Sequence, residues 1–179
     1  MKRIYLDNNA TTPIHTEVLD AMLPYLKDEF GNPSSIHWAG RHPRKAIDDA
    51  REKVARLLNC DASEIIFTSC GSEGDNLAIK GVAELKKDKG NHIITTKVEH
   101  PAVLGTCKYL ARNGFDVTFL DVDSQGMLDP DHVRKAITSK TGLITIMFAN
   151  NETGVIFPIE DIGKIAKEHN IPFHTDAVQ

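Results

Sequence analysis

Short apolar runs alternate with helical patterns along most of the chain, and this alternation restricts the possible folds more than any other feature. Four of the runs are rich in β-branched residues and lack strict polar alternation, as is typical of strands buried on both faces. Helices between successive strands favour a parallel sheet with right-handed crossovers. The sequence predicts an α/β fold with a mostly parallel sheet flanked by helices. The predicted strands are 65–68, 92–96, 115–120, 143–149 and 171–175.

Apolar residues at i, i+3 and i+4 spacing predict the helices between these runs. In the third helix, the expected buried stripe is Leu77, Ala78, Val82 and Leu85. Pro24 should bend the first helix, because a proline inside a helix removes a backbone hydrogen bond. The predicted helices are 16–29, 42–59, 72–87, 101–112, 130–138 and 159–169.

Composition and charge exclude several classes of protein. The net charge is −4 and acids and bases are interspersed, so no basic patch predicts binding to nucleic acid or to an anionic membrane. No apolar run reaches the roughly 18 residues of a membrane span, and the first residues do not form a signal peptide. Three widely spaced cysteines predict neither a disulfide framework nor a metal site. We expect a cytoplasmic protein in a reducing environment.

Polar residues follow the first two predicted strands. Gly71 would let the backbone approach a ligand, and Ser72 would cap the next helix, whose free N–H groups suit a phosphate. An ordinary helix start explains the same residues. His100 follows the second strand, where it could stack on an aromatic ligand, act as an acid or base, or do neither. No second histidine or cysteine stands at metal-ligand spacing, so we expect no metal.

Polar residues also follow the last two predicted strands. Asn150 and Asn151 either hold a turn or face a ligand. Asp176 ends a buried strand, where a carboxylate needs a positive partner; a salt bridge or a protonated pyridine nitrogen would supply one. Parallel strands end at one edge of a sheet, where ligands bind. The combined set matches what bound pyridoxal 5'-phosphate (PLP) requires.

Ordered motifs along the whole chain carry a resemblance to a known family. The chain resembles the NifS/IscS-type cysteine desulfurases, class V aminotransferase-like enzymes with the type I fold of PLP-dependent transferases. The family often has Ala-Thr where this chain has Gly71-Ser72, and serine keeps the hydroxyl group. The motifs are 5–13 (YLDNNATTP), 31–35 (GNPSS) with His37, 66–69 (IFTS), 75–78 (DNLA), Glu99-His100, 150–154 (NNETG) and 174–179 (HTDAVQ).

The resemblance implies a role for each matching position. Gly71 and Ser72 would bind the PLP phosphate, and His100 would stack on the ring as the catalytic histidine. Asn151 would lie beside the ring near the substrate carboxylate. Asp176 would pair with the ring nitrogen. Gln179 would donate a hydrogen bond to the phenolic oxygen.

The resemblance also implies an activity and partners. The family removes sulfur from L-cysteine, giving alanine and an enzyme persulfide. The sulfur then passes to an acceptor or scaffold protein for iron–sulfur cluster or thionucleoside biosynthesis. For the full-length protein, the resemblance implies a homodimer. Residues 1–15 would belong to the small domain, and 16–179 would be the N-terminal part of the PLP-binding large domain.

The family's Schiff-base lysine and nucleophilic cysteine would both lie beyond Gln179. We therefore expect this chain to be an N-terminal fragment, inactive alone, or to need a second chain that supplies the remainder. Selenocysteine lyase and a non-catalytic PLP-fold remnant that acts as a binding module are the alternatives. Cys70 is expected to be a core or loop residue, and Cys60 and Cys107 match no catalytic position.

Overall fold

A computed structural model describes residues 3–88 and 90–179. The chain divides into two compact units, Met1–Phe67 and Thr68–Gln179, which we call the N-terminal unit and the sheet unit. Each unit is described by itself. The predicted division between a small-domain segment and a large domain at residue 16 stays a prediction.

The N-terminal unit consists of α1 (Thr16–Lys27), α2 (Trp38–Leu58) and the short 3-10 helix η1 (Ala62–Glu64). Helix α1 begins at the predicted residue and ends two residues before the predicted end at 29, and Pro24 lies inside it. Helix α2 begins four residues before its predicted start and accommodates Pro43. It ends at Leu58, and the left-handed backbone of the next residue, Asn59 (φ 53°), turns the chain away from the helix axis.

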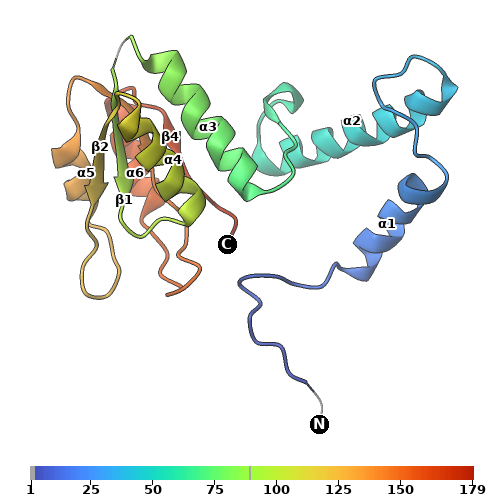
Figure 1. The fold of residues 1–179 in the computed structure, drawn as a ribbon, viewed down its shortest axis with the longest axis horizontal. Helices are drawn as coiled ribbons and strands as arrows, with labels where there is room; N and C mark the ends of the chain where they lie inside the picture. Colours follow the sequence, from blue (N-terminus) through green and yellow to red (C-terminus); the bar gives the residue numbers. More distant parts are fainter. Residues whose placement is uncertain (1–2, 89) are drawn as a thin grey trace. The chain divides into compact units, whose positions relative to one another are not determined.

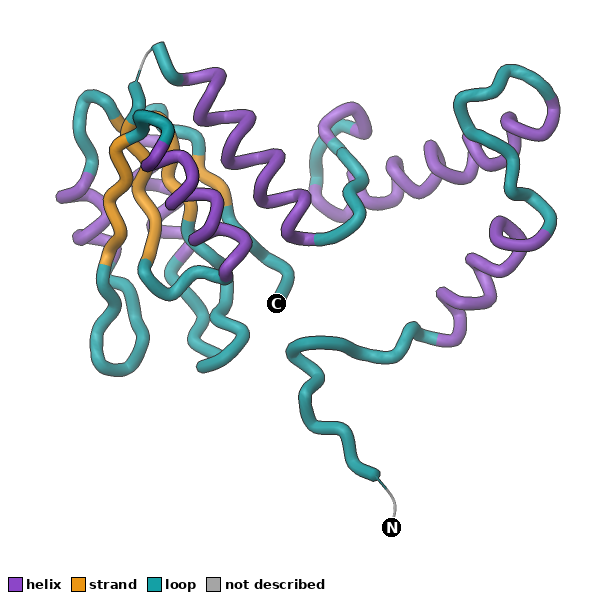
Figure 2. The backbone as a smooth tube through the Cα atoms, in the orientation of Figure 1, coloured by secondary structure: helices purple, strands orange, loops and turns teal. Residues whose placement is uncertain are grey.

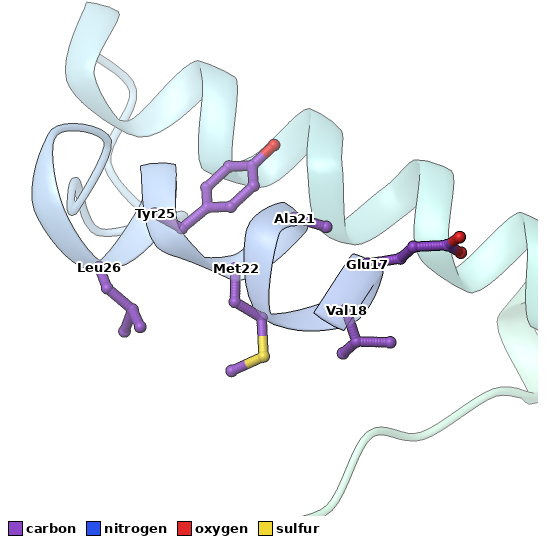
Figure 3. Close-up of a pocket in the computed structure, with 6 residues that line it drawn as sticks. All are labelled: Glu17, Val18, Ala21, Met22, Tyr25 and Leu26. Atoms are coloured by element: carbon purple, nitrogen blue, oxygen red, sulfur yellow. The ribbon is translucent and has the colours of Figure 1, made fainter. Parts of the chain in front are cut away.

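The N-terminal unit leaves much of its apolar surface exposed. Trp38 is 85% exposed and Leu57 is 84% exposed, although Leu57 lies on the apolar side of α2. On α1, Val18, Met22 and Leu26 lie along one side of the helix and line a shallow apolar pocket (Figure 3). The apolar stripe of α1 is therefore not enclosed in a core.

The sheet unit contains four parallel strands in the order β2-β1-β3-β4. Strand β1 forms the centre with β3, and β1 is buried along its whole length. The helices alternate with the strands along the chain, as the sequence predicts (Figures 1 and 2). The strands are β1 (His92–Thr96), β2 (Asp116–Leu120), β3 (Thr141–Thr145) and β4 (Phe173–His174); the helices are α3 (Gly71–Lys86), α4 (Pro101–Arg112), α5 (Pro130–Ala136) and α6 (Ile159–Glu168).

Alternate residues of the central strands point to two separate cores, one on each face of the sheet. Ile93 and Leu143 pack with side chains of α3 and α4. Their neighbours Ile94 and Ile144 pack with side chains of α5 and α6. Successive side chains of a strand point to opposite faces, so the sheet unit has three layers, with helices on both faces of the sheet.

One predicted strand is absent. Residues 65–68 have no strand partner in the described chain, and Ile66 and Phe67 are 68% and 50% exposed. A strand forms only when a neighbouring edge accepts its N–H and C=O groups, and no described strand offers this segment such an edge. Strands β3 and β4 are likewise shorter than the predicted 143–149 and 171–175.

The buried face of α3 also differs from the predicted stripe. Asp75, Ile79 and Ala83 are buried, whereas Leu77 and Leu85 are 51% and 80% exposed. The buried positions follow i, i+4 spacing, with a carboxylate where the pattern expects an apolar residue. The predicted stripe is correct for Val82, which packs against the core, but not for Leu77 and Leu85. The apolar pattern does not mark the buried position of Asp75, because a carboxylate occupies it.

The buried position of Ile144 gives a test of the core. Replacing Ile144, which is fully buried, with alanine should lower the free energy of unfolding by about 2–5 kcal/mol, because it removes buried methyl groups and leaves a cavity. Leu85→Ala on the exposed side of α3 should change it by no more than about 0.5 kcal/mol. Urea titration measures both values; equal losses would contradict the assigned core.

Candidate cofactor site

The candidate site lies at the carboxyl-terminal edge of the sheet. Beyond β3 and β4, parallel pairing continues through backbone hydrogen bonds from Ile146 N to His174 O (3.1 Å) and from Phe148 N to Asp176 O (2.8 Å). Asp176 therefore stands at the end of the ladder. The loops that follow β1, β2 and β3 leave the sheet at the same edge (Figure 1).

Helix α3 begins beside this edge. A Cβ atom placed on Gly71 would lie 2.8 Å from Cγ2 of Val178, so the helix start and the segment after Asp176 are in close contact. Ser69 donates from its backbone N–H and its hydroxyl to Oε2 of Glu73, both at 2.6 Å. These bonds hold the first turn of α3 against the preceding loop.

The predicted capping role of Ser72 is wrong. The helix begins at Gly71, and Cys70 occupies the position before it without a capping side-chain bond. Ser72 instead lies exposed in the first turn. The first-turn N–H groups of a helix lack partners within the helix, and these donors, together with the helix dipole, favour an anion.

His100 stands at the start of α4, with its ring fixed by the backbone. Its Nδ1 accepts a hydrogen bond from the N–H of Ala102 at 3.2 Å. Since Nδ1 serves as acceptor, the proton of the neutral ring lies on Nε2. His100 is exposed, so Nε2 is the ring nitrogen available to a bound molecule.

Side chains of Glu99 and Asn150 connect the loop that carries His100 to the segment that follows β3. Oε1 of Glu99 accepts from the backbone N–H of Met147 at 3.0 Å and from the hydroxyl of Thr96 at 2.8 Å. Nδ2 of Asn150 donates to the carbonyl of Val98 at 3.0 Å. The positions of the His100 loop and the Asn150 turn are therefore coupled.

Asn150 holds a turn. Its Oδ1 accepts from the backbone N–H groups of Glu152 and Thr153, both at 2.9 Å. This is the structural alternative that the sequence left open for the asparagine pair. Asn151, the next residue, is half-buried and leaves from the same edge of the sheet.

Asp176 lies among other titratable side chains. Its Oδ1 accepts from the N–H of Val178 at 3.1 Å, which turns the chain back toward Gly71. Its charge acts on Asp75, Glu99 and His174, and His100 also acts on Asp75. Asp176 and His100 therefore belong to one electrostatic cluster, although the sequence places them far apart.

The buried carboxyl groups of this cluster favour their protonated forms. Burial, reinforced by Asp176, raises the pKa of Asp75 to about 6, while His100 opposes the change. Burial also raises the pKa of Glu99 to about 7, against the opposing bonds from Met147 and Thr96. Each shift reflects the cost of holding a carboxylate in a site that is poor in water.

The residues present fit PLP. Oε2 of Glu99 is buried without a hydrogen-bond partner, so the polar cluster has spare capacity to accept a donor or a positive charge. Because Gly71 has no side chain, the start of α3 can lie against Val178, where a Cβ atom would stand only 2.8 Å from Cγ2. A carboxylate, an imidazole and a helix start at one edge suit a protonated ring that carries a phosphate.

All six sequence-predicted site residues lie in the sheet unit at this edge. Direct proximity joins the segment of Gly71 to that of Val178, and electrostatic interaction joins His100 and Asp176 through Asp75. Ser72 follows Gly71 in the first turn of α3, and Gln179 follows Val178 after β4. Asn151 lies in the turn after β3.

Sequence reasoning missed three residues of the cluster, namely Asp75, Glu99 and His174, as members of the site. Glu99 is 4% exposed and Asp75 is 6% exposed. A signal existed for Asp75, since it occupies a buried-face position of α3 otherwise filled by Ile79 and Ala83. Burying a charged side chain at such a position lowers stability unless a partner balances the charge, so its presence indicates a functional role.

None of the three cysteines belongs to the cluster around Asp176. Cys70 is exposed at the start of α3, Cys60 is partly buried and Cys107 is buried in the core. Within residues 3–88 and 90–179, no cluster of side chains could hold a metal ion. None of the helices described is both long and apolar enough to cross a membrane.

Comparison with known proteins identifies relatives along the whole chain. The family model "Aminotransferase class-V" matches residues 4–179. The chain is 57% identical to the cysteine desulfurase IscS of Dictyoglomus turgidum, over 100% of this chain and 46% of the relative. It is 53% identical to a putative cysteine desulfurase of Bacillus subtilis, over 100% of this chain and 47% of the relative.

Solved structures agree with these relatives. A NifS-like protein matches with a TM-score of 0.95 and 44% identity, over 99% of this chain and 50% of that protein. A structure described as SspA in complex with cysteine matches with a TM-score of 0.94 and 47% identity, over 98% of this chain and 50% of that protein. The chain thus spans about half the length of the relatives it matches.

The raised pKa of Glu99 predicts how stability depends on pH. A carboxyl group whose pKa is higher in the folded state stabilises the fold at low pH, and this contribution is lost as pH rises through the folded pKa. For Glu99 the pKa moves from 4.5 to about 7, so the loss is on the order of 3 kcal/mol between pH 4.5 and pH 7.5. Glu99→Gln, which cannot ionise, should lack this loss.

Urea unfolding at several pH values measures this difference. The exposed residue Glu152 provides the matched control, and Glu152→Gln should follow the pH profile of the unmodified protein. If Glu99→Gln also followed that profile, Glu99 would not be the buried acid described above.

Proposed function

The chain belongs to the aminotransferase class-V family, and on this premise we propose that it is the N-terminal part of a PLP-dependent cysteine desulfurase. One observation carries the proposal: Asp176 stands at the end of the β3–β4 ladder, in electrostatic contact with the cluster that includes His100 and beside the start of α3. The proposed substrate is L-cysteine and the proposed products are alanine and a protein-bound persulfide. The similar structure described as a complex with cysteine supports this substrate.

The proposed cofactor contacts follow from the chemistry of each group. The N–H groups of the first turn of α3, at Gly71 and Ser72, would hold the phosphate together with the Ser72 hydroxyl. Asp176 would accept a hydrogen bond from the protonated ring nitrogen, and Gln179 would donate to the phenolic oxygen. When bound, PLP supplies an electron sink for the substrate α-carbon.

The chain's own residues would orient and protonate the reacting groups. His100, held by its Nδ1 bond to Ala102, would stack on the ring and exchange a proton at Nε2. Glu99 and Asn150 hold the loops that carry His100 and Asn151. Asn151 would bind the substrate carboxylate. These roles need side chains from three strand ends, which explains why the parallel arrangement matters.

The complete reaction needs groups that this chain does not contain. The lysine that carries the cofactor and the cysteine that receives sulfur would lie beyond the position matching Gln179. We propose that they come from the part of the protein corresponding to the second half of the relatives. The sulfur would pass to an acceptor or scaffold protein, and the complete enzyme would be a homodimer.

Replacing Asp176 tests the proposed function. In the full-length protein, Asp176→Ala should cut alanine production from L-cysteine by about 100-fold or more, because the ring nitrogen loses the charge that stabilises its proton. Asp116→Ala, at the exposed start of β2 on the opposite edge, should leave turnover unchanged. Alanine production, measured by chromatography, would refute the role of Asp176 if it stayed the same in both variants.

A further inference from the structure

Asp75 is a buried carboxyl group that the proposed reaction does not use. It lies on the face of α3 that packs toward the sheet and is 6% exposed. Its Oδ1 is 3.5 Å from Nε2 of His174. Among the buried residues of the described chain there is no lysine or arginine to balance its charge. The negative charge of the Asp75 carboxylate must therefore be balanced by a group other than a buried lysine or arginine.

His174 connects Asp75 to the strand that carries Asp176. Nδ1 of His174 lies 2.8 Å from the hydroxyl of Thr145, which fixes the ring with Nε2 directed at Asp75. Burial lowers the pKa of His174, so the ring is neutral at neutral pH and supplies no full positive charge. His174 and Asp176 are two residues apart on extended chain, so their side chains leave the same face.

The titratable groups that face Asp75 come from two segments. They are His174 and Asp176 from the β4 segment, and Glu99 and His100 from the loop between β1 and α4. Three of the five groups in this cluster are carboxyls, and the imidazole in contact with Asp75 is neutral. The cluster is therefore short of positive charge unless a ligand supplies it.

We propose that Asp75 is the second carboxyl group of the ring-nitrogen subsite, a positioning residue that acts through His174 and beside Asp176 to hold a cationic ring. This inference rests on the proposed function. Below its pKa of about 6, the Asp75 carboxyl carries a proton when the subsite is empty; when a ring with a protonated nitrogen binds, that proton passes to solvent. The resulting carboxylate adds its charge to that of Asp176.

The electrostatics support this exchange. The charge of Asp176 is one cause of the raised pKa of Asp75, which lies near 6. A bound cation beside Asp176 would cancel that repulsion and lower the pKa of Asp75, so binding would release a proton below about pH 6.5. By the same linkage, binding of the cation strengthens as pH rises through 6.

Two ligands distinguish this role from a structural one. Pyridoxal 5'-phosphate carries the ring nitrogen, whereas its benzene-ring analogue has the same shape and phosphate without it. In the full-length protein, Asp75→Asn should weaken binding of pyridoxal 5'-phosphate at pH 7.5 by about three- to tenfold, the effect of one nearby charge in a partly screened site. Affinity for the analogue should stay unchanged.

A calorimetric measurement keeps the inference testable if Asp75→Asn fails to fold. Titration of the unmodified protein with pyridoxal 5'-phosphate at pH 6, in two buffers of different ionisation enthalpy, should show release of a fraction of a proton beyond that seen with the analogue. Where Asp75→Asn folds, it should abolish this excess.

Each outcome has one meaning. Equal weakening of both ligands by Asp75→Asn, no weakening of either, or no excess proton release would overturn the role of Asp75. Failure of the unmodified protein to bind pyridoxal 5'-phosphate would instead overturn the proposed function. Sensitivity to Asp176→Ala combined with indifference to Asp75→Asn would retain the proposed function and reject this inference.

Discussion

The parallel pairing of β3 with the β4 segment determines where the chemistry of this chain can occur. The ladder runs from Ile144 N to Pro172 O and ends with Phe148 N bound to Asp176 O. It delivers Asp176 to the same edge as the His100 loop, which Glu99 ties to Met147. A slip of one residue would turn Asp176 to the opposite face, so this register controls the whole site.

Local signals were strong enough to predict β1 and α4 to the residue. Pro101 fits the first turn of α4, and Gly114, with a positive φ of 91°, turns the chain after it. The segment 65–68 was predicted wrongly because a strand needs an edge to pair with, and pairing depends on other parts of the chain. Asp75 was not predicted as a site residue, because its partner His174 is distant in sequence and only the fold brings them together.

The site buries carboxyl groups at a cost in folding free energy that apolar residues at the same positions would avoid. Glu99 and Asp75 are buried carboxyls with raised pKa values, and Oε2 of Glu99 has no hydrogen-bond partner. Replacing such groups with apolar residues would remove the cost of burying charge. By contrast, His92, at the other end of the sheet, contacts two threonine hydroxyls, which is how a structural buried histidine is satisfied. Asp75 and Glu99 have no lysine or arginine among the buried residues of the described chain, and a cationic ligand of the proposed kind would supply the positive charge that they lack.

The proposed site places a phosphorylated, protonated ring at one sheet edge, between the start of α3 and Asp176. A crystal structure of the full-length protein with pyridoxal 5'-phosphate tests this most directly. The phosphate should lie on the N–H groups of Gly71 and Ser72, the ring nitrogen within hydrogen-bond distance of the Asp176 carboxylate, and His100 against the ring. A cofactor bound elsewhere, or with its ring nitrogen turned away from Asp176, would contradict it.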